Sequence, residues 1–229
     1  MQGLLYIDKP ADWTSFDVVA YVRKMVARIE GKKPKNVKVG HTGTLDPAAT
    51  GLLILCVGKA TKRVPELIKK DKVYEVELTL GYTSTTADKE GEISLVSSEV
   101  PTLDQVKAVI QKFVGEIEQT PPAFSAIKVN GKRSYELARA GKPVVLTPRS
   151  VTIYSIENLI YEYPKVYFRA TVSSGTYIRS LAIDIGEGLG VGAYMSQLRR
   201  TGIGDVSINK AYELSALTDE ILQKTLVEK

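Results

Sequence analysis

The stretch GHTGTLDPAATG, residues 40–51, runs directly into the apolar run LLILCV at residues 52–57. Glycine and proline allow or impose backbone conformations that other residues avoid, and threonine hydroxyls bond nearby backbone groups. With three glycines, one proline and three threonines, the first stretch is typical of a tightly turned loop that fixes the direction of a side chain. The continuous apolar run predicts a fully buried strand after it.

Asp46 lies inside this loop, one residue before Pro47. A residue that precedes proline is pushed toward an extended conformation. On local composition alone, such an aspartate is more often a turn residue that bonds its own backbone than a catalytic carboxylate. The local sequence leaves both interpretations open.

Composition and charge limit the class of protein. The 229 residues are 44% hydrophobic and 25% charged, which is ordinary for a globular chain with a substantial core. A net charge of +5 suits a polyanionic partner. Cys56 is the only cysteine, so a disulfide framework and a cysteine-based zinc site are excluded. The apolar stretch at residues 4–7 is too short for a signal peptide, and no segment is long enough to span a membrane, so we expect a cytoplasmic protein.

The rest of the chain predicts intermingled strands and helices. Alternation or continuous apolar character predicts strands, whereas capping residues and apolar positions at helical spacing predict helices. The strands do not alternate strictly with helices as in a doubly wound parallel sheet, so we predict one α+β domain over residues 1–229. The predicted strands are 4–7, 52–57, 74–80 and 166–172, and the predicted helices follow Thr14 or Ser15, follow Thr102, begin near Ile178 and follow Leu214.

Residues 120–150 interrupt the regular pattern. Prolines and a hairpin-like Asn130-Gly131 pair break the segment into turns. The segment also carries a group of cations, which predicts a basic insertion that contacts phosphates without reading a base sequence. The candidate phosphate contacts are Lys128, Lys132, Arg133 and Arg139.

Residues 40–51 resemble the catalytic-loop motif of the TruB family of tRNA pseudouridine synthases. Four further blocks agree with the family in order and spacing, so the resemblance covers almost the whole chain. It implies the pseudouridine synthase fold, in which helices flank a central mixed, mostly antiparallel sheet and a basic insertion grips the RNA. The four blocks are Lys9-Pro10, Lys72-Val73-Tyr74, the segment from 121 to 141, and residues 174–179 with 198–201.

The resemblance implies that the chain converts uridine to pseudouridine in the T loop of tRNA. Asp46 takes the place of the catalytic aspartate, and Arg179 is its expected partner, because a nearby guanidinium lowers a carboxyl pKa by roughly 1–3 units. Tyr74 is expected to stack on the target base and to help remove the proton from C5. Attack on the base, attack on C1′ and proton removal from C2′ with a glycal intermediate all stay open. The reaction implies no metal and no organic cofactor.

The same resemblance suggests residues that bind the substrate. The target base has to leave its stack, and His41 is expected to brace the gap that it leaves. Tyr177 and Leu198 resemble residues that line the pocket, and Lys9 belongs to the opening motif. Taken locally, Arg179 could equally be a solvated residue in the first turn of a helix.

The chain departs from the family pattern in three places. Asp12 stands where the family usually has glycine, and the residues after Thr201 differ from the usual arginine and later proline. Members commonly continue into a small RNA-binding PUA domain, and few residues remain here after Ser215. We therefore expect no PUA domain and weaker tRNA affinity, whether the lineage lacks that domain or the chain is truncated.

Two other functions compete with a stand-alone tRNA enzyme. The guide-RNA-dependent branch of the superfamily modifies ribosomal RNA with partner proteins, and a catalytically silent protein could serve as an RNA chaperone. The sequence of residues 43–51 and the basic insertion at residues 120–150 favour an enzyme that acts on the T arm of tRNA. We expect it to act as a monomer, without an obligate protein partner. Intact Asp46, Tyr74 and Arg179 argue against a silent chaperone.

Overall fold

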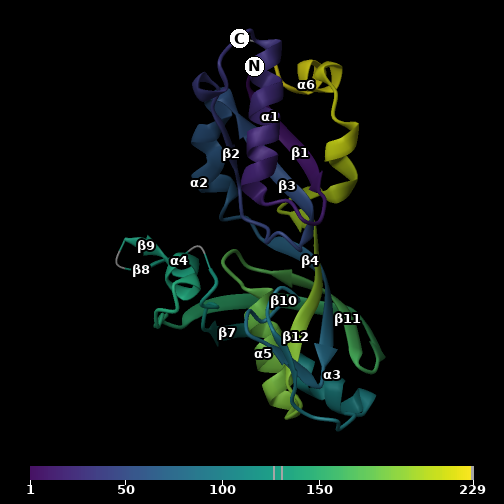
Figure 1. The fold of residues 1–229 in the computed structure, drawn as a ribbon. Coiled ribbons are helices and arrows are strands. Elements are labelled where there is room, and N and C mark those ends of the chain that lie inside the picture. The colour runs from purple at the N-terminus through teal and green to yellow at the C-terminus, as the bar shows by residue number, and fades with distance from the viewer. Residues whose placement is uncertain (126, 130, 228–229) are drawn as a thin grey trace. The chain divides into compact units, whose positions relative to one another are not determined.

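The computed structural model describes residues 1–125, 127–129 and 131–227, without the side chains of residues 128, 129, 133, 135 and 139. The chain divides into two compact units (Figure 1). The first unit comprises Met1–Tyr74 and Arg199–Lys229, and the second comprises Glu75–Leu198. Strands β4 (Lys72–Leu80) and β12 (Ala193–Ile203) contribute residues to both units.

The first unit is built around β3 (Thr50–Val57), the predicted buried strand. It pairs antiparallel with β1 (Gly3–Lys9) and with β2 (Val39–His41), and parallel with β12 at Arg199 and Arg200. The short β14 (Tyr212–Glu213) pairs parallel with β1, and β13 (Val206–Ser207) pairs with β12. Every residue from 51 to 57 is buried, which explains the unbroken apolar run.

Helix α1 (Ser15–Ile29) covers this part of the sheet (Figure 1). Of the two residues predicted to precede this helix, Thr14 is the N-cap. Its hydroxyl accepts a hydrogen bond from the Asp17 N–H, and the Asp17 carboxylate accepts one from the Thr14 N–H. Apolar residues of α1 pack with β1, β3 and the C-terminal α6 (Asp219–Thr225) in one core. The remaining helical segments of the unit are η1 (Pro34–Asn36), η2 (Gly58–Arg63), α2 (Val64–Leu67), η3 (Ile208–Lys210) and η4 (Leu214–Ala216).

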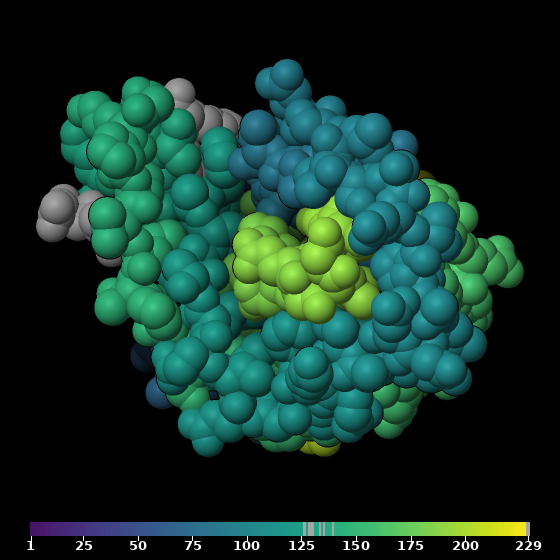
Figure 2. All heavy atoms as spheres, turned by 90° about the horizontal axis from the view of Figure 1, so that it is seen from below, coloured from purple at the N-terminus to yellow at the C-terminus, as the bar shows by residue number. Residues whose placement is uncertain are grey.

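The second unit contains the strand order β12-β4-β11-β10-β7. Strand β10 (Arg149–Glu162) pairs antiparallel with β11 (Lys165–Val172) and β7 (Gly115–Gln119). Helices α3 (Leu103–Gln111) and α5 (Ile178–Leu189) contact each other. Helix α3 follows Thr102, as predicted, and Thr102 and Gln105 form a capping box at its start. Figure 2 shows the yellow-green surface of α5 bordered by blue-green segments of the same unit. The smaller elements are β5 (Tyr82–Ser84), β6 (Ile93–Leu95), β8 (Lys128–Val129), β9 (Lys132–Arg133) and α4 (Ser134–Arg139).

The α+β class, with a mixed sheet flanked by helices, is confirmed. Strands β8 and β9 pair across residues 130 and 131, in agreement with the expected two-residue hairpin, although Asn130 itself lies outside the described residues. The single-domain assignment stays a prediction.

Strand β4 is more buried than its alternating sequence indicates. Tyr74, Val76, Leu78 and Leu80 form the expected apolar face, but Glu77 and Thr79 on the other face are buried too. Lys165 compensates this burial, since its Nζ lies 2.5 Å from Glu77 Oε1 and 2.9 Å from the Thr79 hydroxyl. Burial alone would raise the pKa of Glu77, but Lys165 and the Ser196 hydroxyl hold that pKa below its usual value.

Strand β12 approaches β3 closely at Gly51, and we expect Gly51→Ala to destabilise the protein strongly. A Cβ at Gly51 would lie 2.3 Å from the Arg200 carbonyl oxygen, and the backbone φ of 104° is unfavourable for any L side chain. We expect the free energy of unfolding, measured in urea, to fall by about 3 kcal/mol or more.

Gly31→Ala is the matched control. Gly31 also has a positive φ, of 62°, but a Cβ added there would have no heavy atom within 4 Å among its non-neighbouring residues. This change should cost only about 1–2 kcal/mol. If both variants lost the same free energy of unfolding, the close approach of β12 to Gly51 would not be the cause of the loss in Gly51→Ala.

Candidate active site

Asp46 lies in the loop that joins β2 to β3. The residues beside it are anchored, because Leu45 and Ala49 are buried in the protein interior while Asp46 is half-buried. The Ala49 N–H donates to the Asp46 carbonyl oxygen at 3.1 Å, which closes a turn around Pro47. The loop is therefore tightly turned, as its composition predicts.

Two donors hold the loop on the C-terminal side of Asp46. Lys9 is fully buried, and its Nζ donates to the carbonyl oxygens of Pro10 (2.8 Å), Trp13 (2.6 Å) and Pro47 (3.1 Å). The Asp12 N–H donates to the same Pro47 carbonyl at 2.9 Å. Carbonyl oxygens compensate the burial of the ammonium charge. In these contacts Lys9 holds backbone segments of the protein together. Its assignment to RNA binding stays a prediction.

The geometry also explains the departure at Asp12. Its φ is 65°, in the left-handed region that favours glycine. Aspartate tolerates this conformation better than most residues. The backbone at this position therefore reaches Pro47 even though the family's usual glycine is absent.

Arg200 holds the other side of the loop. Its side chain is buried, with Nε donating to the Leu52 carbonyl oxygen at 2.8 Å. Nη2 lies 3.1 Å from the Gly43 oxygen and Nη1 lies 3.4 Å from the Thr44 oxygen. The sequence placed Arg200 in a family block without giving it a role, because nothing local indicates which carbonyl groups it meets.

Three other predicted residues have defined positions. Tyr74 is buried in β4 at the end of the apolar face. His41 ends β2 opposite Leu55, and its Nδ1 accepts the Gly43 N–H at 3.4 Å. Tyr177 caps α5, where its backbone N–H and carbonyl both bond the Gln119 side chain, at 2.7 and 3.0 Å.

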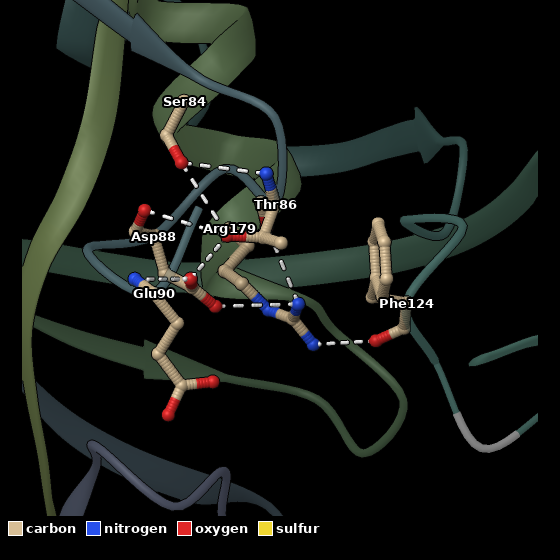
Figure 3. A network of polar contacts seen from close by, with 6 residues as sticks. All are labelled: Ser84, Thr86, Asp88, Glu90, Phe124 and Arg179. Carbon is tan, nitrogen blue, oxygen red and sulfur yellow. Dashed lines mark hydrogen bonds and ion pairs between the residues drawn. The ribbon is translucent and has the colours of Figure 1, made fainter. Parts of the chain in front are cut away.

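Arg179 lies in the first turn of α5 and is not solvated, since only 7% of it is exposed (Figure 3). Its Nη1 lies 3.4 Å from Asp88 Oδ2 and 3.3 Å from the Thr86 carbonyl oxygen. Its Nη2 donates to the Phe124 carbonyl oxygen at 2.8 Å. The alternative of a solvated surface arginine is therefore wrong.

Asp88 is itself fixed by its loop. Its Oδ1 accepts the Thr86 hydroxyl and the Glu90 N–H, the latter at 3.0 Å, and the Thr86 hydroxyl also lies 3.3 Å from the Ser84 hydroxyl (Figure 3). The carboxylate is buried, so it orients the guanidinium of Arg179 in a region of low dielectric. Sequence reasoning missed Asp88, because it stands among ordinary turn residues.

The candidate residues are divided between the two units. His41, Asp46, Tyr74 and Lys9 belong to the first unit, and the pairing of Asp46 with Arg179 stays a prediction. Lys132 is exposed on β9, whereas the side chains of Lys128, Arg133 and Arg139 lie outside the described part of the chain. The candidates of the second unit are Tyr177, Arg179, Leu198 and the cations of the insertion.

Positive charge is concentrated in the first unit. That unit has 19 Lys and Arg against 12 Asp and Glu, a net charge of +7, whereas the second has 12 against 14, a net charge of −2. The two values add to the +5 of the whole chain. The net charge of the unit that carries Asp46 is thus suited to a polyanion.

Lys72, two residues before Tyr74, is a buried cation. Its Nζ donates to the Ile68 carbonyl oxygen at 2.6 Å and to that of Lys70. Burial lowers the pKa of Lys72 to about 8, the charge of Arg200 contributes to this lowering, and Asp71 opposes the shift. A neutral amine keeps two hydrogens, so both bonds survive deprotonation.

No helix among the residues that the structure describes has the length and apolar character needed to cross a membrane.

The fold is that of pseudouridine synthases. The crystal structure titled as a Cbf5-Nop10-Gar1 complex superposes with a TM-score of 0.71 at 35% identity, covering 96% of this chain and 54% of that chain. A structure of an H/ACA RNP bound to a substrate RNA containing 2'-deoxyuridine gives a TM-score of 0.68 at 32% identity, covering 96% of this chain and 53% of that chain.

The chain belongs to the TruB family. The model of the TruB family pseudouridylate synthase N-terminal domain matches residues 29–178, and that of the tRNA pseudouridylate synthase B C-terminal domain matches residues 179–229. The tRNA pseudouridine synthase B of Phocaeicola vulgatus is 45% identical over 226 residues, which cover 98% of this chain and 95% of that protein. That of Clostridium kluyveri is 45% identical over 227 residues, covering 99% and 76%.

Removal of the Asp88 charge should destabilise the protein, because it removes a buried carboxylate that faces the buried Arg179 guanidinium. We expect Asp88→Asn to lower the free energy of unfolding by about 3 kcal/mol in urea titrations. Asp219→Asn removes the carboxylate of an exposed pair with Arg28 and should cost much less. Similar losses in the two variants would show that Asp88 does not stabilise Arg179.

Deprotonation of Lys72 should make the protein more stable as the pH rises. The ordinary lysine pKa is 10.5, so between about pH 8 and 10.5 the unfolded chain binds more protons than the folded one. Over that range the free energy of unfolding should rise by up to about 3 kcal/mol, and Lys72→Met should abolish this rise. Below about pH 8 the ammonium is charged in both states, and its full burial cost remains.

Urea titrations at several pH values test this expectation. Lys69→Met, which changes an exposed neighbour, serves as the control and should leave the pH dependence intact. A difference between wild type and Lys72→Met that stays constant with pH would contradict the depressed pKa.

Proposed function

We propose that this protein isomerises uridine to pseudouridine in the T loop of tRNA, with Asp46 as the catalytic carboxylate. The observation that carries the proposal is the construction of the loop around Asp46. Buried donors bind the Pro47 carbonyl on one side and the Gly43 and Thr44 carbonyls on the other. A half-buried carboxylate on a rigid loop, in a chain of the TruB family, suits a reaction that depends on orientation.

The reaction breaks the bond between C1′ and the base nitrogen, turns the uracil and joins C5 to the same C1′. It requires an ionised carboxylate close to the sugar. In the proposal, Arg179 stabilises that carboxylate, and the Asp88, Thr86 and Phe124 contacts keep its guanidinium oriented. No atom is lost and no redox change occurs, so the proposal includes no metal and no cofactor.

The remaining candidates bind the RNA. The target base must leave its stack at a cost of a few kcal/mol, and Tyr74 receives it by stacking. His41 braces the loop from which the base departs, while Tyr177 and Leu198 line the base pocket. Lys128, Lys132, Arg133 and Arg139 neutralise phosphates of the T arm.

The protein acts in the cytoplasm as a monomer on its tRNA substrate. A guided enzyme with protein partners is the second candidate, because the Cbf5 structure that matches this fold is a complex with Nop10 and Gar1. The first candidate is favoured by the greater identity to tRNA pseudouridine synthase B proteins, 45% against 35%.

The deciding experiment uses the chain alone with an unmodified tRNA transcript and maps pseudouridine in the product. We expect wild type to modify one T-loop uridine and Asp46→Asn to lose activity by at least about 10³-fold, because it lacks the ionised carboxylate. Asp219→Asn, an exposed carboxylate on α6, should keep wild-type activity.

Three outcomes would contradict the proposal in different ways. Binding of tRNA by wild type without any product would exclude a stand-alone enzyme. Activity restored only by a guide RNA and added proteins would favour the second candidate. Full activity in Asp46→Asn would remove Asp46 from the catalytic role.

A further inference from the structure

Leu45, the residue directly before Asp46, is bonded through both of its backbone groups to one side chain. The Leu45 N–H donates to Ser15 Oγ at 2.8 Å, and the Ser15 hydroxyl donates to the Leu45 carbonyl oxygen at 3.1 Å. Both residues are buried, with Ser15 2% and Leu45 3% exposed. A serine hydroxyl can donate one hydrogen and accept others, so this geometry uses it as donor and acceptor at once.

The bond to the Leu45 carbonyl acts on the peptide plane that joins Leu45 to Asp46. That plane is rigid, so fixing its carbonyl oxygen limits rotation on either side of it. The backbone rotation at Asp46 then determines where its Cβ and carboxylate point. Lys9, Asp12 and Arg200 hold neighbouring carbonyls of the loop, but the Ser15 hydroxyl holds the plane that leads into Asp46 itself.

Ser15 is well placed for this task because it belongs to a rigid element. It is the first residue of α1, whose buried face packs into the core of the first unit. Thr14 caps the helix independently, through the Asp17 N–H and carboxylate. The hydroxyl of Ser15 is therefore not needed for capping and bonds the loop instead.

We propose that Ser15 is a positioning residue for the reaction: its hydroxyl fixes the peptide plane before Asp46 and thereby the direction of the catalytic carboxylate. This inference rests on the proposed function. A serine that only stabilised the end of α1 would have no particular effect on the chemical step.

Ser15→Ala tests the inference, with Thr14→Ala as the matched control. Both variants remove a hydroxyl at the same end of α1, but only the first removes the bonds to Leu45. We expect single-turnover pseudouridine formation to slow by about 10- to 100-fold in Ser15→Ala, because a small misplacement of a reacting group has an effect of that size. The tRNA dissociation constant should stay within about twofold of wild type, since no RNA contact is lost.

Thr14→Ala should lower the unfolding midpoint, because it loses the capping bonds, while its single-turnover rate stays within about twofold of wild type. Hydrogen exchange gives a local readout, since the Leu45 amide should exchange faster in Ser15→Ala and not in Thr14→Ala. Ser15→Cys replaces the hydroxyl with a larger thiol that is a weaker donor and acceptor, so it should also be slow.

The outcomes separate the inference from the function on which it rests. No product from wild type would refute the proposed function. An active wild type with Ser15→Ala no slower than Thr14→Ala, or with a loss of tRNA affinity in place of a loss of rate, would refute the role of Ser15 alone. If Ser15→Ala does not fold, Ser15→Cys decides: a wild-type rate overturns the inference and a slower rate at unchanged affinity supports it.

Discussion

The arrangement of the first unit depends on the hydrogen bonds of the Arg200 guanidinium. It lies buried where β12 meets β3, and it bonds the carbonyl oxygens of Leu52, Gly43 and Thr44. The approach of the two strands is so close that Gly51 admits no side chain. One side chain thus joins the strand pairing to the loop of Asp46, so the packing of the sheet and the geometry of the candidate site cannot change independently.

The two units satisfy their buried cations in different ways. In the first, Lys9, Lys72 and Arg200 bond backbone carbonyls. In the second, the buried Arg179 faces the carboxylate of Asp88, and the half-buried Lys165 faces that of Glu77. Carbonyl groups compensate the desolvation of a cation without cancelling its charge. The first unit also has the positive net charge that suits binding to a polyanion.

Local sequence patterns predicted local structure well and distant contacts poorly. The helix starts after Thr14 and Thr102 and the buried strand after Gly51 follow from residues close together in the chain. The loop of Asp46 was found from its motif. Ser15, Asp88 and Arg200 were missed as supporting residues, because the residues that they support, Leu45, Arg179 and the Gly43-Thr44 pair, lie 30 or more residues away, and no sequence periodicity indicates such contacts. The burial of Glu77 was missed for the same reason, since Lys165 lies on another strand.

The division of the first unit into two stretches of sequence has a consequence for synthesis on the ribosome. Residues 75–198 of the second unit are continuous, whereas the first unit needs residues from 199 onward to complete its sheet. The loop of Asp46 is made early, but the guanidinium that anchors it emerges more than 150 residues later. A nascent chain can therefore hold the loop of Asp46 through Lys9, Asp12 and Ser15 early, but it lacks the Arg200 anchor until residue 200 has been made.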